Sequence, residues 1–185
     1  MSGPPAWRPL IDAALRANPT QASARYAQLA TVRPDGRPAN RTVVFRGFLP
    51  DGRLTFTTDT RSEKAGDLER LACAELCWSF TATREQFRLL GPAAINLRGL
   101  DTRRFELWHE LPESSRQTFV WPQPGAPRSP DEAFRRPVPA DPPPNFGLLI
   151  LSPDRVDHLD LRPHPHARTV YTDNGVTWDA EPVNP

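Results

Sequence analysis

Two arginines bracket a short apolar run in the stretch NRTVVFRGF, residues 40–48. The run TVVF is typical of a buried strand, and side chains on a strand alternate between its two faces. Arg41 therefore shares one face with Val43, and Arg46 shares the opposite face with Val44. A guanidinium group binds phosphate or carboxylate oxygens in pairs, and a strand's backbone can contact a flat polar ring lying along it. Either the two arginines hold different parts of a ligand, or they are solvated residues at the ends of an ordinary strand.

A second polar group follows in TTDTRSEK, residues 57–64, at an expected junction between a strand and a helix. Thr57, Thr58 and Ser62 supply hydroxyl groups, and Lys64 supplies the only ammonium side chain of the chain. Backbone N–H groups at the start of a helix favour a bound phosphate. The stretch predicts either a phosphate site or an ordinary capped loop.

Two further stretches place polar side chains at strand spacing. Arg84, Gln86 and Arg88 alternate onto one face, where the amide of Gln86 can meet both donor and acceptor edges of a ring. His164 and His166 are two residues apart and would face the same way on a strand. Two histidines without a third ligand do not make a metal site, so we expect no metal. They would line a pocket or the surface, together with Arg168 of the same HPHAR stretch.

The composition is that of one cytoplasmic domain. The chain has 185 residues, of which 38% are hydrophobic, and its longest apolar run, FGLLIL at 146–151, is far too short to span a membrane. The first residues do not resemble a signal peptide. Cys73 and Cys77, four residues apart in an apolar segment, predict buried thiols in a reducing compartment. The balance of 23 basic and 22 acidic residues argues against a nucleic-acid partner.

The periodicity of the chain predicts a small, mainly β barrel with a few helices, in one domain over residues 1–185. Two PDG turns, at 34–36 and 50–52, predict successive hairpins, and DNG near the C-terminus predicts another. Nine prolines make 121–144 a long loop. About six or seven antiparallel strands are expected, in a closed or partly open barrel. Helices are expected at 5–18, at 61–72 with Ser62 as its cap, at 101–111 with Asp101 or Thr102 as its cap, and within 112–119; strands are expected at 74–80 and 84–97, with two more in 145–162.

Taken in order, these segments resemble the pyridoxamine 5'-phosphate oxidase family of flavin mononucleotide (FMN) split barrels. The resemblance rests on ATVRPDGRPANRTVVFRGF, LTFTTDTRSEKAGDLE, LCWSF followed by REQFRLLG, and VDHLDLR, and it runs from about Arg25 to the C-terminus. It is nearest to a cyanobacterial-type subgroup. The resemblance implies a six-stranded antiparallel split barrel with flanking helices. It also implies a homodimer that binds FMN at the subunit interface.

The resemblance also carries over site residues by position. Arg41 would pair with the FMN phosphate, and Arg46 would lie near the flavin ring or the substrate. The residues that match cofactor-binding positions are Arg41, Thr42, Val43, Val44, Arg46, Thr57, Thr58, Ser62, Lys64, Gln86 and Arg168. The residues at substrate-binding positions are Arg46, Ser115, His164 and His166.

Several positions depart from the family pattern, mostly on the substrate side. Leu107 and Leu111 stand where the oxidases have a tyrosine and an arginine that hold the substrate phosphate, and His164 stands where they have an arginine. Other departures are Glu63 for an arginine of the phosphate-binding run, Leu159 for a tryptophan, and Pro124 and Gly125 for a Gln-Ser flavin contact. The FMN half of the site therefore matches better than the substrate half.

The function implied is that of an FMN-dependent oxidoreductase, which transfers a hydride from a small substrate, an amine by analogy, to FMN that oxygen reoxidises. No side chain is assigned as a catalytic base, because the cofactor performs the chemistry. The alternative is a non-catalytic split barrel that binds a flavin or haem.

Overall fold

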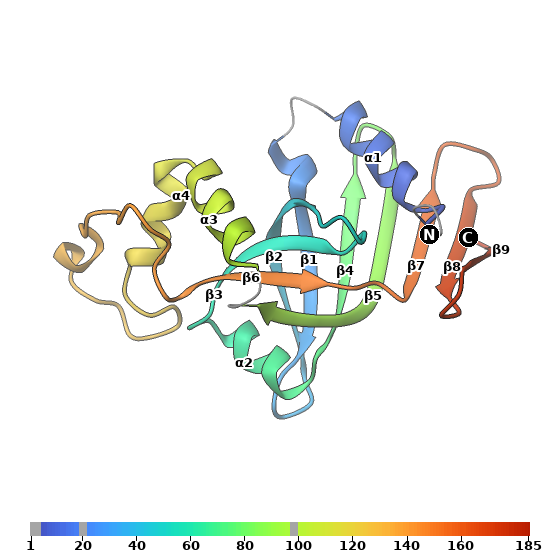
Figure 1. Cartoon of the computed structure of the whole chain (residues 1–185). Helices are drawn as coiled ribbons and strands as arrows, with labels where there is room; N and C mark the ends of the chain where they lie inside the picture. The colour runs from blue at the N-terminus through green and yellow to red at the C-terminus, as the bar shows by residue number, and fades with distance from the viewer. Residues whose placement is uncertain (1–4, 19–21, 97–99) are drawn as a thin grey trace.

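The computed structural model describes residues 5–18, 22–96 and 100–185, and its centre is a closed antiparallel barrel (Figure 1). Six strands pair in the order β4-β1-β2-β3-β6-β5, and a further pairing of β4 with β5 closes the ring. This confirms the predicted six-stranded barrel. The barrel strands are β1 (Tyr26–Val32), β2 (Pro38–Phe48), β3 (Leu54–Asp59), β4 (Cys73–Phe80), β5 (Glu85–Asn96) and β6 (Phe146–Leu151).

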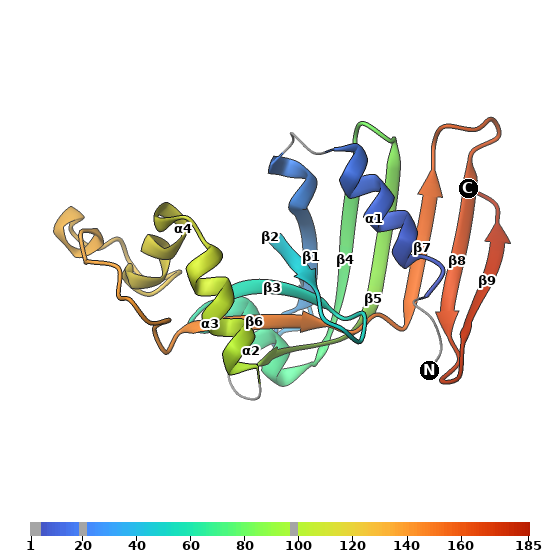
Figure 2. The ribbon, with the colours of Figure 1, turned by 45° about the horizontal axis from the view of Figure 1, so that its top comes forward.

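Three more strands extend the sheet beyond the barrel, on the side of β5. They are β7 (Arg155–Asp160), β8 (Ala167–Asp173) and β9 (Trp178–Val183), and Figure 2 shows them continuing the sheet that β4 and β5 begin. The expected six or seven strands were therefore too few for the described part of the chain. The DNG turn joins β8 to β9 as predicted, with Gly175 at a φ of 85°.

Strand β5 belongs both to the barrel and to the sheet that extends beyond it, and it changes partners near Gly91. Its first half pairs with β4 and β7, and its last residues pair with β6. A Cβ atom at Gly91 would lie 2.1 Å from the carbonyl oxygen of Ser152 and 2.9 Å from the backbone nitrogen of Asp154. Only glycine fits at this close approach of two backbones.

Alternation along the strands fills the barrel with apolar side chains. Trp78, Phe45 and Phe56 are almost completely buried there, and the ring of Phe45 packs against both of the others. A second apolar cluster lies outside the barrel, where β6 meets the helices. It contains Leu49, Leu107, Trp108, Leu111, Phe119, Phe146, Leu148 and Ile150.

The predicted helices are present with modest shifts at their ends. Ser62 is at the N-cap position of α2, but its hydroxyl donates to the Asp59 carbonyl oxygen at 2.6 Å and does not cap the helix. The predicted cap of α3 was wrong, because the helix already includes Asp101 and its N-cap residue is Leu100. The elements are α1 (Arg8–Ala17), η1 (Ala22–Arg25), α2 (Glu63–Arg70), α3 (Asp101–Glu110), α4 (Glu113–Gln117), η2 (Thr118–Val120) and η3 (Asp131–Phe134).

Two strand assignments were wrong at the level of single residues. Arg84 lies in the turn before β5, with a φ of 53°, and does not share the strand face of Gln86. His164 and His166 lie in the loop between β7 and β8 and not on a strand. The proline-rich segment 121–144 is a loop with one short 3₁₀ turn, as expected. None of the helices described is long and apolar enough to cross a membrane.

Candidate functional site

A cavity of about 460 Å³ lies between β2, β3, the start of α2 and the proline-rich loop. This volume is within the usual range for small-molecule sites. It brings together six of the predicted cofactor positions, which are Thr42, Val43, Val44, Thr57, Thr58 and Lys64. We call it the β2–α2 cleft.

Strand β2 forms one wall of the β2–α2 cleft. Thr42 and Val44 point outward from the barrel, whereas the side chain of Val43 is 5% exposed and belongs to the barrel interior. Val43 can therefore contact a ligand only through its backbone. The wall is a strip of extended backbone with one hydroxyl and one aliphatic side chain, which can meet the polar and apolar parts of a ring lying along it.

Lys64 lies at one end of the β2–α2 cleft and makes few contacts of its own. Its Nζ donates to the Ser62 hydroxyl at 2.9 Å, and the side chain is partly buried. Burial, followed by the nearby charge of Arg41, lowers the pKa of the Lys64 ammonium. An anion placed here would relieve both effects, because it would supply the missing counter-charge.

Arg41, on the interior face of β2, does not line the cleft, but its charge acts on Lys64. Its guanidinium contacts Asp67 of α2 at 3.3 Å and the Thr31 hydroxyl of β1 at 2.5 Å. Arg41 therefore ties α2 to the barrel as well as adding positive charge beside Lys64. A phosphate would share this guanidinium with Asp67.

Two charged neighbours are directed away from this group. Arg61 pairs with Asp59 at 2.6 Å and donates to the carbonyl oxygen of Trp121 at 3.2 Å, so it fastens the proline-rich loop. Glu63 is exposed and lies 3.9 Å from Arg33. The cationic group at this end thus consists of Lys64, which lines the cleft, and Arg41, which lies behind it; Ser62, the hydrogen-bond partner of Lys64, lines the neighbouring hollow.

The proline-rich loop forms the outer wall of the β2–α2 cleft. Trp121 and Phe134 both line the cavity, and their rings pack edge to face with centroids 5.7 Å apart. Pro124 and Gly125 also line it, at the positions where the family's flavin contact is missing. A larger hollow, of about 810 Å³, lies between α2 and the other side of the proline-rich loop. Glu63 lines this hollow, but neither Lys64 nor any residue of β2 does.

Gln86 and Arg168 lie apart from the cleft, on the outer face of β5, β7 and β8. Gln86 is paired in register with Leu159, and Leu159 with Arg168. Arg168 donates from Nε and Nη2 to the carboxylate of Asp157, at 3.0 and 2.7 Å. Arg88 donates to the same carboxylate at 2.5 Å. The hydrogen bond from Arg168 and the adjacent Arg88 together hold the pKa of Asp157 at about 2, although burial opposes the shift.

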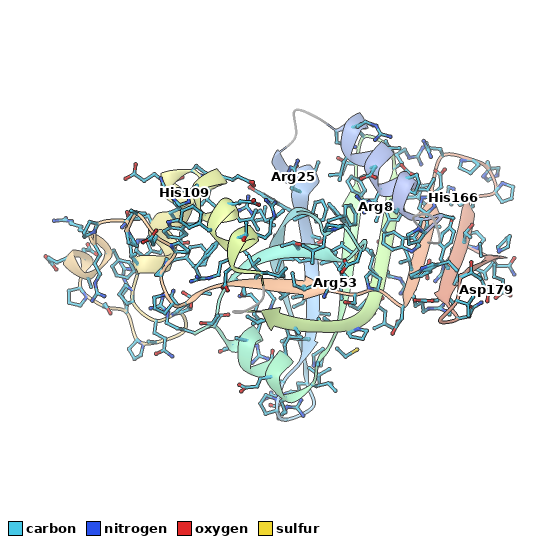
Figure 3. The ribbon with its side chains drawn as sticks, in the orientation of Figure 1. Arg8, Arg25, Arg53, His109, His166 and Asp179 are labelled. Atoms are coloured by element: carbon cyan, nitrogen blue, oxygen red, sulfur yellow. The ribbon has the colours of Figure 1, made fainter. Side chains whose placement is uncertain are left out.

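The predicted substrate residues are not brought together within one chain. Ser115 is on α4, at the end of the molecule opposite the β7–β8 loop that carries His164 and His166 (Figure 1). Figure 3 shows His166 at the β8 side, far from helix α3, where His109 is labelled. Arg46 is on β2, between these two ends.

Sequence reasoning did not find the acidic residues that organise these arginines. Asp157 and Asp67 are almost completely buried, and their partners Arg88 and Arg41 are 69 and 26 residues away. A buried carboxylate normally needs such a partner. The Asp within the partly apolar strand RVDHLD could therefore have indicated a buried ion pair. Cys73 and Cys77 are free and half-buried on β4, and the described residues contain no cluster of three or more His, Cys, Asp or Glu suited to a metal.

The comparison with known proteins settles which family has this arrangement. Residues 4–96 match the family described as "Pyridoxamine 5'-phosphate oxidase, FMN-binding domain". Pyridoxine/pyridoxamine 5'-phosphate oxidase 2 of Arabidopsis thaliana is 36% identical over 192 residues, covering 97% of this chain and 96% of the relative. The chain belongs to this family.

Two solved structures resemble this chain over most of its length. A pyridoxamine 5'-phosphate oxidase-related, FMN binding protein from Nostoc punctiforme PCC 73102 has a TM-score of 0.93 and 46% identity, over all of both chains. PhzG from Burkholderia lata 383, in complex with tetrahydrophenazine-1-carboxylic acid, has a TM-score of 0.79 and covers 94% of this chain and 88% of its own. Its 20% identity shows a shared fold only.

FMN is the cofactor of this family, and the β2–α2 cleft fits it. Lys64 and Arg41 supply cationic donors of the kind that a phosphate needs, and Lys64 lacks a carboxylate partner among the described residues. The strip of β2 with Thr42 and Val44 offers a surface for a flat ring. The prediction of FMN from the sequence is confirmed at the level of the family.

Proposed function

We propose that the protein is an FMN-dependent oxidoreductase that takes a hydride from a small substrate, an amine in the simplest case. The observation that supports this most strongly is the β2–α2 cleft, where Lys64 and the β2 residues Thr42 and Val44 line a single cavity. Bound FMN would supply the hydride acceptor and the route to oxygen.

The protein's part in this reaction is to bind and orient. Lys64 and Arg41 hold the phosphate end of the cofactor through charge-assisted hydrogen bonds. The Ser62 hydroxyl, which accepts from Lys64 and donates to the Asp59 carbonyl oxygen, positions the ammonium group. Thr42 and Val44 set the position of the ring along β2. The proline-rich loop, fastened by Arg61 to the carbonyl oxygen of Trp121, limits access of water to the outer side of the cleft.

We further propose that the site is completed by a second copy of the chain. Gln86 and Arg168 lie on the outer face of the sheet, away from the β2–α2 cleft that they are predicted to serve. Ser115 and the two histidines of the β7–β8 loop lie at opposite ends of one chain (Figure 1). A homodimer with FMN at its interface would bring the two groups together.

The test is the visible absorption spectrum of the purified protein, before and after addition of FMN and desalting. We expect a retained flavin band that is released as FMN on denaturation. Anaerobic addition of an amine should bleach the band, and air should restore it. A protein that fails to retain FMN would contradict the proposal.

A second candidate is a flavin-binding module without turnover, and the substrate half of the site favours it. Leu107 and Leu111, at the positions of two substrate-phosphate ligands, are 1% and 4% exposed and cannot contact a ligand. Flavin that stays bound but is reduced by neither amines nor NAD(P)H would support this second candidate over the oxidoreductase.

A further inference from the structure

The proline-rich loop, residues 121–144, has a defined shape although it contains little regular structure. Proline has no backbone N–H, and the carbonyl oxygens of a proline-rich segment therefore need donors from elsewhere. Side chains from helices α3 and α4, which lie beside the loop in Figure 1, and from the start of α2 supply these donors. The donors are Arg61 (to Trp121, 3.2 Å), Trp108 (to Ala140, 3.0 Å), Arg104 (to Pro142, 3.2 Å) and Gln117 (to Arg136, 2.7 Å). The loop is therefore a preformed wall of the β2–α2 cleft.

Trp121 stands at the start of this wall, directly after the 3₁₀ turn η2. Pro122 follows it and restricts its backbone to extended conformations, in agreement with its ψ of 163°. The carbonyl oxygen of Trp121 accepts a hydrogen bond from Arg61, whose guanidinium also pairs with Asp59 at 2.6 Å. The proline and the ion-paired arginine together fix the backbone of Trp121.

The indole ring of Trp121 is held by Phe134 but is not covered by it. Phe134 ends η3, and the two rings pack edge to face with their planes at 69°. Arg128 lies over the Phe134 ring, 4.1 Å from its centroid, and pairs with Asp131 at 2.6 Å. Trp121 nevertheless remains 38% exposed. A large aromatic side chain that lines the cleft is thus kept partly open in a set orientation.

Trp121 is the aromatic residue best placed to meet a ligand in the β2–α2 cleft. Among the described residues that line the cavity, the aromatic ones are Phe119, Trp121 and Phe134. Phe119 is 9% exposed and packs on Trp108 and Phe146 in the second apolar cluster. Phe134 is already engaged by Trp121 and by Arg128. An aromatic ring with a free face binds other flat rings by offset or edge-to-face stacking.

The two walls of the cleft determine where such a ring would lie. Thr42 and Val44 line the cavity from β2, and Trp121 lines it from the proline-rich loop. Lys64 lines the same cavity and would hold the anionic end of the ligand. A ring joined to that anion would therefore lie between β2 and the indole.

We propose that Trp121 is a cofactor-contacting residue whose indole packs against the flavin ring of FMN. Phe134 is a positioning residue, because it sets the direction of the indole through the packing of the two rings. This inference rests on the proposed function and adds to it a contact from the proline-rich loop.

The test is the fluorescence lifetime of FMN bound to the protein. An excited flavin takes an electron from an indole in contact with it and loses its emission, after which the electron returns; a phenyl ring cannot donate that electron. We expect a strongly shortened lifetime in the wild type and a severalfold longer one in W121F. W121A should also weaken FMN binding by about tenfold, the scale of an aromatic contact together with its buried area. F134A should broaden the distribution of lifetimes, because the indole loses the ring that orients it.

The matched control is W178F, which removes a tryptophan of β9 whose ring packs on Trp7 and does not line the β2–α2 cleft. Its flavin lifetime should equal that of the wild type. Tyrosine also donates electrons to excited flavin, so each lifetime is measured again in a Y26F background, which removes the exposed tyrosine beside Thr42. The thermal unfolding of apo-W121F should match that of the wild type, because Trp121 belongs to neither apolar cluster.

Equal lifetimes in W121F and the wild type, in both backgrounds, would overturn the contact, and so would an equal rise in W178F. A weaker affinity in W121A without any change of lifetime in W121F would also overturn it, since the indole would then not meet the flavin ring. A protein that retains no FMN would instead defeat the proposed function, so the two failures are distinguishable.

Discussion

Asp157 holds the two arginines Arg88 and Arg168 on the outer face of the sheet. One carboxylate accepts hydrogen bonds from Arg168 and Arg88, and its side chain is only 5% exposed. Arg168 uses Nε and Nη2 for this contact, which leaves Nη1 available for another acceptor. Asp157 therefore fixes the direction in which Arg168 presents its remaining donors.

This role predicts coupling between Asp157 and Arg168 in FMN binding. D157N should weaken FMN binding by about tenfold, the scale of one charge-assisted hydrogen bond, because Arg168 loses its anchor. In an R168A background the same substitution should have little further effect. Titration of apo-protein with FMN for the four variants measures the coupling. D160N, which breaks the exposed Arg162 pair on the same strand, is the control. Equal effects of D157N in both backgrounds would contradict the positioning role.

The same carboxylate predicts that the free energy of unfolding decreases at acidic pH. The pKa of Asp157 is held at about 2, below the ordinary value of 3.8. Its contribution is therefore complete above about pH 4 and is lost as the pH falls toward 2. The shift corresponds to about 2 kcal/mol of unfolding free energy. Urea unfolding between pH 5 and about pH 2 should show a shallower loss for D157N than for the wild type.

Lys64 predicts a limit to FMN binding at alkaline pH. Burial lowers the pKa of this ammonium, so it loses its proton at a lower pH than an exposed lysine does. FMN affinity should fall as the pH rises through that range. K64M should bind FMN about tenfold or more weakly and without this pH dependence, whereas K64R should retain affinity at high pH. Fluorescence titrations with FMN at several pH values would show it. An identical alkaline decline in K64M would assign the titration to another group.

Turns and helices were predictable from the sequence because their chemistry is local. Both PDG turns and the DNG turn specify hairpins through the residues that they contain. The total number of strands in the sheet was not predictable locally, since the extension beyond the six-stranded barrel depends on β5 pairing with β7 as well as with β4 and β6. Six of the predicted cofactor positions, on β2, β3 and α2, line one cleft, and their role in binding FMN stays a prediction. Their acidic partners come from distant segments and were not predicted.

At the scale of the strands, the close packing of β5 against residues 152–154 requires a glycine at position 91. In G91A the new Cβ would collide with the backbone of residues 152–154, which hydrogen bonds hold against Leu90 and Pro92. We expect a loss of about 3 kcal/mol in unfolding free energy, because the obstructing atoms are backbone and cannot rotate away. The control is G66A in α2, where nothing lies within 4 Å and alanine should stabilise by about 0.5–1 kcal/mol. Urea unfolding of the apo-proteins provides both values, and equal midpoints would contradict the argument.

At the scale of the whole molecule, the outer face of the barrel has the character of an interface. Tyr26 is 44% exposed there, and a shallow hollow of about 260 Å³ beside it is lined by Gln28, Thr42 and Ser79. Gln86 pairs in register with Ser79, and Arg168 follows in the same row through Leu159, so both belong to this face of the sheet. A second chain covering this face would bury the aromatic ring and would place these polar groups beside the partner's cleft.

A charge placed on this face should therefore separate the subunits and weaken FMN binding together. We expect the wild type to elute as a dimer in size-exclusion chromatography with light scattering. S79R should shift it toward the monomer and reduce FMN retention, because Ser79 is exposed on one chain and would be covered by the second. V176R, at a hairpin position that is 85% exposed, should change neither property. The thermal unfolding of apo-S79R should show one cooperative transition, since no core contact is altered.

A monomeric wild type that still retains FMN would mean that one chain holds the cofactor alone. Gln86 and Arg168 would then have no part in binding it.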